Sequence, residues 1–273
     1  MILRLILIIA ATLTGCSRPG PSDERLTVAA GLYPLAEAAR AVAGGRAAVG
    51  EVVPPGAEPH DAEVSPDQVD LLLDADLVVT VEGLQPSVDD VVASRDRGSV
   101  VVPAGPDRHP WLDPIRMRGI AGRVSEALAD ADPAGAGEYR GNERSFAREL
   151  ERLDAEYSSA LSGCEDETLV VTHAAFGALQ RYGLRQEAIV GSSPEAEPDP
   201  ARLAELSDLM RKEGIDTVFA EPYAPQDVAQ TLARDAGARV LTLDPIERAP
   251  RGGGRYLDLM RQNLDALREG LGC

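Results

Sequence analysis

Short apolar runs alternate with helical patterns on both sides of one long helical stretch, and this alternation restricts the possible folds more than any other feature. The apolar runs predict strands at residues 26–30, 47–53, 77–81, 99–102, 168–172, 217–220 and 238–243. Helical patterns occupy residues 34–42, 200–213, 226–235 and 256–271. Strands that alternate with helices along a chain favour parallel sheets covered by helices.

The long helical stretch is predicted over residues 138–161. Its apolar side chains recur mostly at intervals of three, four or seven and form one stripe: Tyr139, Phe146, Leu150, Leu153, Tyr157 and Leu161. We therefore expect an α/β fold with two parallel-sheet lobes joined by one long backbone helix. The expected boundaries are 26–136 for the N-terminal lobe, 137–163 for the linking helix and 164–273 for the C-terminal lobe.

Two further helices are predicted from the residues that start them. Ser65 precedes Pro66 and is followed three residues later by Gln68, which is a capping-box pattern. Asp113 precedes Pro114 in the same way and predicts a second helix start there.

The first 16 residues have the pattern of a secretory signal. Arg4 precedes an apolar run over residues 5–13, too short for a membrane span, which needs about 20 residues. A buried N-terminal helix is the alternative, but the Pro- and Gly-containing residues 17–22 would break it. Leu13-Thr14-Gly15-Cys16 resembles the bacterial lipobox. We expect a signal peptide at 1–15, a lipidated Cys16 and a flexible tether over 16–25, hence a protein anchored outside the cytoplasm on the bacterial cell membrane.

Two more cysteines, Cys164 and Cys273, remain after Cys16. Outside the cytoplasm, an even remainder favours a disulfide between them, which ties residue 273 back to the middle of the chain. Two unpaired thiols are the alternative. A catalytic cysteine is disfavoured, because no histidine lies near either residue in the sequence.

The charge balance excludes one class of partner. The chain has 27 Lys+Arg against 45 Asp+Glu, a formal net charge of −18, which would repel the phosphates of nucleic acids. Hydrophobic residues make up 44% of the chain, enough to build a sizeable core, so a disordered chain is excluded as well.

The chain contains only three histidines, and all of them stand at or beyond the carboxyl end of a predicted strand: His60, His109 and His173. Glu221 and Asp244 follow two other predicted strands in the same manner. Ligands of open α/β sheets bind at the carboxyl ends of the strands. These five side chains are therefore candidates for one metal site between the lobes.

Neutral imidazoles together with a carboxylate suit Zn²⁺ in four-coordinate geometry. The wide separation of the candidates excludes a local zinc finger, whose ligand pairs lie a few residues apart. Each residue also has a structural alternative. A histidine after a strand can be a simple hydrogen-bonding group, Asp244 could cap a helix, and Glu221 could support a ligand or lie on the surface.

Six short segments around these residues occur in the order found in one known family. They are Leu32-Tyr33-Pro34-Leu35, Glu58-Pro59-His60-Asp61, His109-Pro110-Trp111-Leu112-Asp113-Pro114, Thr172-His173-Ala174-Ala175-Phe176-Gly177, Phe219-Ala220-Glu221-Pro222 and Leu243-Asp244-Pro245. In register along nearly the whole mature chain, they resemble the metal-binding lipoproteins of ABC uptake transporters, of the zinc-uptake (ZnuA-type) kind.

The resemblance implies that metal is held in the cleft by the matching residues His60, His109, His173 and Asp244. It also implies a binding protein that performs no catalysis and delivers Zn²⁺ to the membrane permease of an ABC transporter. We expect it to act as a monomer.

Manganese and iron binders of the same class usually have Glu where this chain has His173. A third imidazole favours Zn²⁺, and Mn²⁺ or iron stays the alternative. The chain departs from the family at two places. Residues 83–107 contain no histidine, although zinc members often carry a His-rich loop there, and Pro110 restricts His109 to extended conformations.

Two hypotheses of other classes stay open. In a zinc hydrolase, three histidines would hold the metal and Glu221 would act as general base on a bound water. Asp244 discriminates, because a fourth protein ligand would take the position of that water. The second hypothesis is a surface adhesin, in which zinc only holds the lobes together.

Overall fold

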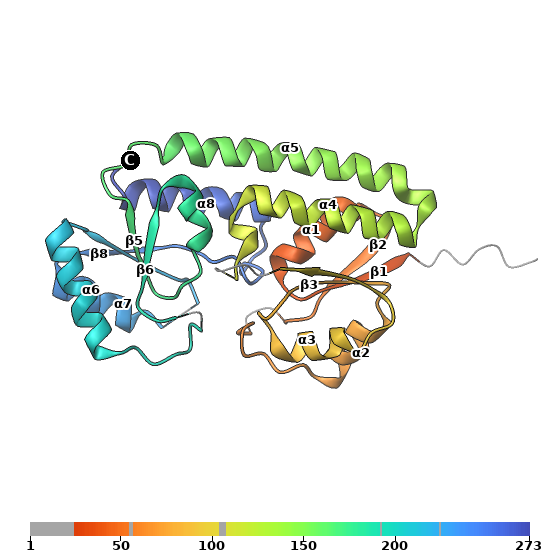
Figure 1. Ribbon diagram of the computed structural model, residues 1–273, viewed down its shortest axis with the longest axis horizontal. Helices are drawn as coiled ribbons and strands as arrows, with labels where there is room; N and C mark the ends of the chain where they lie inside the picture. The colour runs from red at the N-terminus through yellow and green to blue at the C-terminus, as the bar shows by residue number, and fades with distance from the viewer. Residues whose placement is uncertain (1–24, 55–56, 104–107, 192, 224) are drawn as a thin grey trace, which may run out of the picture.

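The computed structural model describes residues 25–54, 57–103, 108–191, 193–223 and 225–273. These residues form two four-stranded parallel sheets, of order β2-β1-β3-β4 and β6-β5-β7-β8 (Figure 1). The strands are β1 (Leu26–Ala30), β2 (Ala47–Glu51), β3 (Leu77–Val81), β4 (Gly98–Val102), β5 (Thr168–Val171), β6 (Arg185–Ala188), β7 (Thr217–Ala220) and β8 (Arg239–Thr242). The predicted α/β class with two parallel sheets is confirmed. The expected signal peptide, Cys16 and all but residue 25 of the tether lie outside the described residues.

Helices cover both faces of each sheet (Figure 1). On the first sheet, α1 (Tyr33–Ala43) and α4 (Pro114–Ala131) cover one face, and α2 (Pro66–Asp74) and α3 (Pro86–Ala93) cover the other. On the second sheet, α8 (Tyr256–Gly270) covers one face, and α6 (Pro200–Glu213) and α7 (Asp227–Ala236) the other. The predicted long helix is α5 (Ala136–Ala160), whose 25 residues run along the molecule and connect the two sheets. No helix in the described ranges is long and apolar enough to cross a membrane.

One continuous hydrophobic core runs beneath α5 and joins the two lobes. It contains Val79 from the first sheet, Leu150 and Leu153 from α5, Leu169 from the second sheet and Leu267 from α8, all buried. A large apolar interface restricts the motion of two lobes relative to each other. The separate cores under α2 and α3 and under α6 and α7 belong to one lobe each.

Both helix starts predicted from capping residues occur in the structure. Ser65 and Gln68 form the reciprocal capping box of α2, and Asp113 Oδ1 accepts a hydrogen bond of 2.8 Å from the backbone N–H of Ile115 at the start of α4. Among the strands and α-helices of the described residues, α3 and β6 were missed. The β6 sequence, Arg-Gln-Glu-Ala, has no apolar alternation, and at the edge of the sheet its side chains stay partly exposed.

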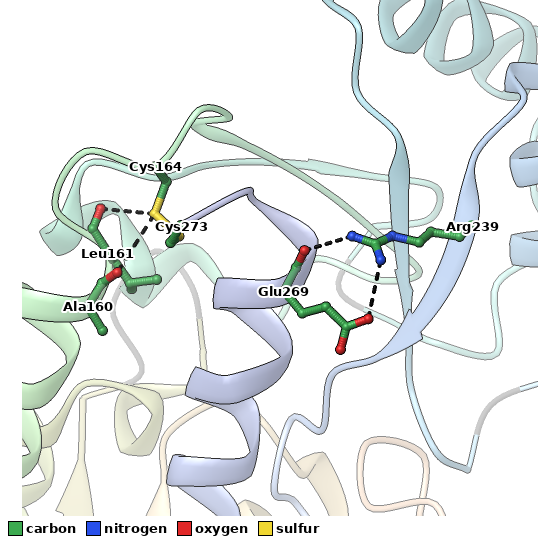
Figure 2. The surroundings of a disulfide bond; sticks show 6 residues. All are labelled: Ala160, Leu161, Cys164, Arg239, Glu269 and Cys273. Atoms are coloured by element: carbon green, nitrogen blue, oxygen red, sulfur yellow. Dashed lines mark hydrogen bonds and ion pairs between the residues drawn. A yellow bond between two sulfur atoms is a disulfide. The ribbon is translucent and has the colours of Figure 1, made fainter.

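The end of α8 is fastened to the start of the second lobe. Cys164 and Cys273 form a disulfide that closes a segment with a sequence separation of 109 residues (Figure 2). Next to it, the carbonyl oxygen of Leu271 accepts backbone hydrogen bonds from Glu165 and Asp166, at 3.1 and 3.2 Å. The guanidinium of Arg239, the first residue of β8, also donates to the backbone and side chain of Glu269 in α8 (Figure 2).

Candidate metal centre

Four buried side chains meet between the two sheets, each from a loop that follows a different strand. They are His60 after β2, His109 after β4, His173 after β5 and Glu247 after β8. One nitrogen of each imidazole and one carboxylate oxygen of Glu247 all lie within 4.8 Å of one another. The three ring centroids are 5.3, 5.5 and 5.7 Å apart, so the imidazoles form a nearly equilateral triangle.

The Glu247 carboxylate lies among the three imidazoles. Its Oε1 is 2.6 Å from His109 Nε2, 2.9 Å from His60 Nε2 and 3.7 Å from His173 Nε2. Burial alone would raise the pKa of Glu247, but the hydrogen bonds from His109 and His60 outweigh it and hold the pKa well below its usual range. The two imidazoles therefore stabilise the ionised form of this buried carboxylate.

His173 is oriented by a second carboxylate. Its Nδ1 lies 2.5 Å from Glu221 Oε1, and the Thr172 hydroxyl donates to the same oxygen at 2.5 Å. Burial would lower the pKa of His173, but the Glu221 carboxylate raises it overall. A proton held on Nδ1 leaves a lone pair on Nε2. That Nε2 is buried and has no hydrogen-bond partner among the described residues, as expected of an atom poised to bind an ion.

Further contacts hold the loops that carry the other two imidazoles, His60 and His109. The backbone N–H of His60 donates to Glu58 Oε1 at 3.1 Å. The His109 ring packs on the Trp111 ring, with centroids 5.1 Å apart, and the Trp111 indole N–H donates to the carbonyl oxygen of Pro245 at 2.7 Å. This last bond ties the His109 loop to the loop that carries Glu247.

Asp244 does not lie in the cluster, which corrects the expectation that it is the fourth ligand. Its Oδ1 accepts the backbone N–H of Ile246 at 2.7 Å, and its own N–H donates to Asn263 Oδ1 of α8 at 2.9 Å. Ile246 is held at φ = 57°, in the left-handed region that β-branched residues rarely adopt. This turn directs the side chain of the next residue, Glu247, towards the imidazoles. Burial raises the pKa of Asp244 to about 6.

Glu247 was missed because the loop after β8 offers two carboxylates in four residues, Asp244-Pro245-Ile246-Glu247. One sequence signal favoured Glu247 as the ligand. Asp244 precedes Pro245, and an Asp before Pro is typical of a turn that the Asp side chain itself stabilises. The structure brings the three predicted histidines together and places Glu221 behind His173.

The donor set fits a zinc ion. Three imidazole nitrogens and one carboxylate oxygen are the ligand types of four-coordinate zinc sites, and a nitrogen-rich set is less suited to manganese. The His60 side chain is the most accessible of the three imidazoles, with the residue only 7% exposed, so the cluster is shielded from water.

Comparison with known proteins agrees with this chemistry. The family model "Zinc-uptake complex component A periplasmic" (ZnuA) matches residues 28–270. The zinc-binding lipoprotein AdcA of Streptococcus pneumoniae is 31% identical over 95% of this chain, and the chain spans 58% of the length of AdcA.

Solved structures extend the likeness to three dimensions. The laminin-binding protein Lmb of Streptococcus agalactiae, described as having adhesin and metal-transporting activity, superposes with a TM-score of 0.84 at 31% identity, covering 90% of this chain and 99% of Lmb. The Zn(II)-bound ZnuA-like domain of Streptococcus pneumoniae AdcA superposes with a TM-score of 0.79 at 31% identity, covering 92% of this chain and all of that domain. With a family match over almost its whole described length, the chain belongs to the ZnuA family of zinc-uptake complex components.

Proposed function

We propose that this protein captures Zn²⁺ outside the cytoplasm and delivers it to the permease of an ABC transporter. The observation that carries the proposal is the buried cluster of His60, His109, His173 and Glu247, in which the described residues offer no hydrogen-bond partner to His173 Nε2. We assign these four residues as the zinc ligands and Glu221 as the group that orients His173. Family membership and the zinc-bound relative support the same ion.

The protein is proposed to bind zinc without catalysis and to act as a monomer. Four protein ligands complete the coordination shell and leave no position for an activated water. Glu221 contacts Nδ1 of His173 rather than the nitrogen that faces the cluster, so it is poorly placed as a general base for a hydrolase. Lipidation of Cys16 would keep the protein on the outer side of the membrane, where the permease collects its ion.

The proposal is tested by metal analysis and calorimetric titration of the purified protein. We expect one Zn²⁺ per chain, bound more tightly than Mn²⁺, and an affinity that falls as the pH drops below about 6.5 because zinc ligation needs neutral imidazoles. Because the pKa of His173 is raised, protons should begin to compete with zinc for this imidazole at a higher pH than for an ordinary histidine. Tighter binding of Mn²⁺ than of Zn²⁺ would contradict the proposal.

A Glu221→Gln substitution should weaken zinc binding by about 10–100-fold at neutral pH, the usual effect of removing a partner of a ligand histidine. The neutral amide no longer stabilises the protonated imidazole, so the pKa of His173 should fall and the loss of binding in acid should shift to lower pH. Competition titrations with a zinc chelator from pH 5 to 8 measure both effects. Glu205→Gln, at an exposed carboxylate on α6, is the matched control. Unchanged affinity and pH profile in Glu221→Gln would rule out the assigned role.

A second function, adhesion, is favoured by the likeness to Lmb, which is described as a laminin-binding protein with adhesin activity. Binding of the purified protein to immobilised laminin, with and without a zinc chelator, tests it. Saturable binding supports adhesion, and a signal no greater than that of immobilised albumin refutes it.

A further inference from the structure

Three loops around the metal centre are connected by one arginine. Arg248 follows the ligand Glu247 directly, and its Nη2 forms an ion pair with Glu58 Oε2 in the loop after β2. The guanidinium carbon also lies 5.3 Å from the centre of the Tyr223 ring, in the loop after β7. Arg248 thus joins a loop of the N-terminal lobe to two loops of the C-terminal lobe.

We propose that Arg248, Glu58 and Tyr223 form a clasp that sets the rate at which zinc enters and leaves the site. The inference rests on the proposed zinc-binding function. All three act as positioning residues, because none of them belongs to the cluster of four ligands.

Each member of the clasp is connected to a ligand. The carboxylate of Glu58 pairs with Arg248 through one oxygen and accepts the backbone N–H of His60 through the other, at 3.1 Å. Tyr223 lies two residues after Glu221, which orients His173. Loss of the Arg248 charge would therefore release constraints on the loops of His60, His173 and Glu247 together.

The location of the clasp also points to control of access. A recess of about 10 Å³, the space of about one water molecule, reaches Glu247 and is lined in addition by Glu221, Tyr223, Asp244, Pro245 and Arg248. The Arg248 and Glu58 side chains are 15% and 17% exposed, so their ion pair is largely shielded from water and stronger than a surface pair.

The four ligands are buried, and the hydrophobic core under α5 holds the two lobes together. An ion can therefore enter or leave the site only if the loops around it separate. The clasp contains no ligand and can form whether or not an ion is bound. Breaking it should therefore accelerate both binding and release and leave the equilibrium constant nearly unchanged.

The test is stopped-flow release of zinc into an excess of a chromogenic chelator. Arg248→Gln and Glu58→Gln should each release zinc about tenfold faster than wild type, with a Kd within about threefold. The amide oxygen introduced by Glu58→Gln can still accept the N–H of His60, so this variant removes only the ion pair. The double variant should release zinc no faster than Arg248→Gln, because that substitution already removes the ion pair with Glu58. The matched control is Arg251→Gln, whose guanidinium carbon lies 5.7 Å from the same Tyr223 ring, and it should stay within twofold of wild type.

Release within twofold of wild type in Arg248→Gln, or multiplicative effects in the double variant, would overturn the clasp. A metal-free measurement separates this failure from failure of the proposed function. Hydrogen exchange of residues 57–62 without metal should be faster in Arg248→Gln than in Arg251→Gln, whatever ion the protein carries. Equal exchange in the two variants would also refute the clasp, whereas absence of zinc binding by wild type would refute the function alone.

Discussion

Replacing Glu247 with alanine should lower the affinity for zinc by more than about 100-fold, whereas Asp244→Asn should change it by less than about threefold. Removing a residue that hydrogen-bonds to a metal ligand already lowers metal affinity by about 10–100-fold, so removing the ligand itself should lower it further. Glu247 is the carboxylate that lies 2.6 and 2.9 Å from two imidazoles. Asp244 instead accepts the N–H of Ile246, and the amide oxygen of asparagine can do the same.

Calorimetric competition titrations of both variants at neutral pH give the two affinities. The thermal stability of the metal-free proteins serves as the control, because a disordered loop after β8 would also weaken binding. A stronger loss in Asp244→Asn than in Glu247→Ala would show that Asp244 is the ligand after all and that the loop rearranges when the ion binds.

Replacing both Cys164 and Cys273 with serine should lower the free energy of unfolding by about 2–5 kcal/mol. The disulfide closes a segment with a sequence separation of 109 residues, and cross-linking a loop of this length restricts the unfolded chain strongly. The native geometry should survive, because Leu271 and Arg268 accept backbone hydrogen bonds next to the bridge. The midpoint of thermal unfolding should fall by roughly 10 °C.

Urea unfolding of the metal-free double variant measures this loss. Reduced wild-type protein is the internal comparison and should show the same stability as the double variant. Zinc affinity should be unchanged in both, because the bridge follows the carboxyl end of α8, whereas α8 contacts the loops of Trp111 and Asp244 through Tyr256 and Asn263. A loss below about 1 kcal/mol would mean that the unfolded chain gains little freedom when the bridge is removed.

Much of the fold could be predicted from local patterns. Strands β1 and β7 and helix α6 have the predicted bounds, since their apolar runs and capping residues are local signals. The edge strand β6 could not be predicted, because only pairing with β5 makes a polar segment extended. Helix α3 was missed as well: no side chain caps its start at Gln85.

The candidate site shows the same division. Three histidines, each beyond the carboxyl end of a strand, are enough to predict a shared metal site, because parallel strands bring these ends to one edge. Local patterns do not reveal which carboxylate joins the three histidines. Asp244 and Glu247 lie in the same loop, and their order in the chain says nothing about which of them faces the histidines.

The sequence by itself thus determined the α/β class, the long connecting helix and the three imidazoles, because each depends on periodicity or on position relative to a strand. Only the tertiary structure decided that Glu247 joins them, that Asp244 shapes the turn and that Arg248 connects three loops. These choices depend on the left-handed backbone at Ile246 and on contacts between residues up to 190 positions apart, which no local pattern encodes.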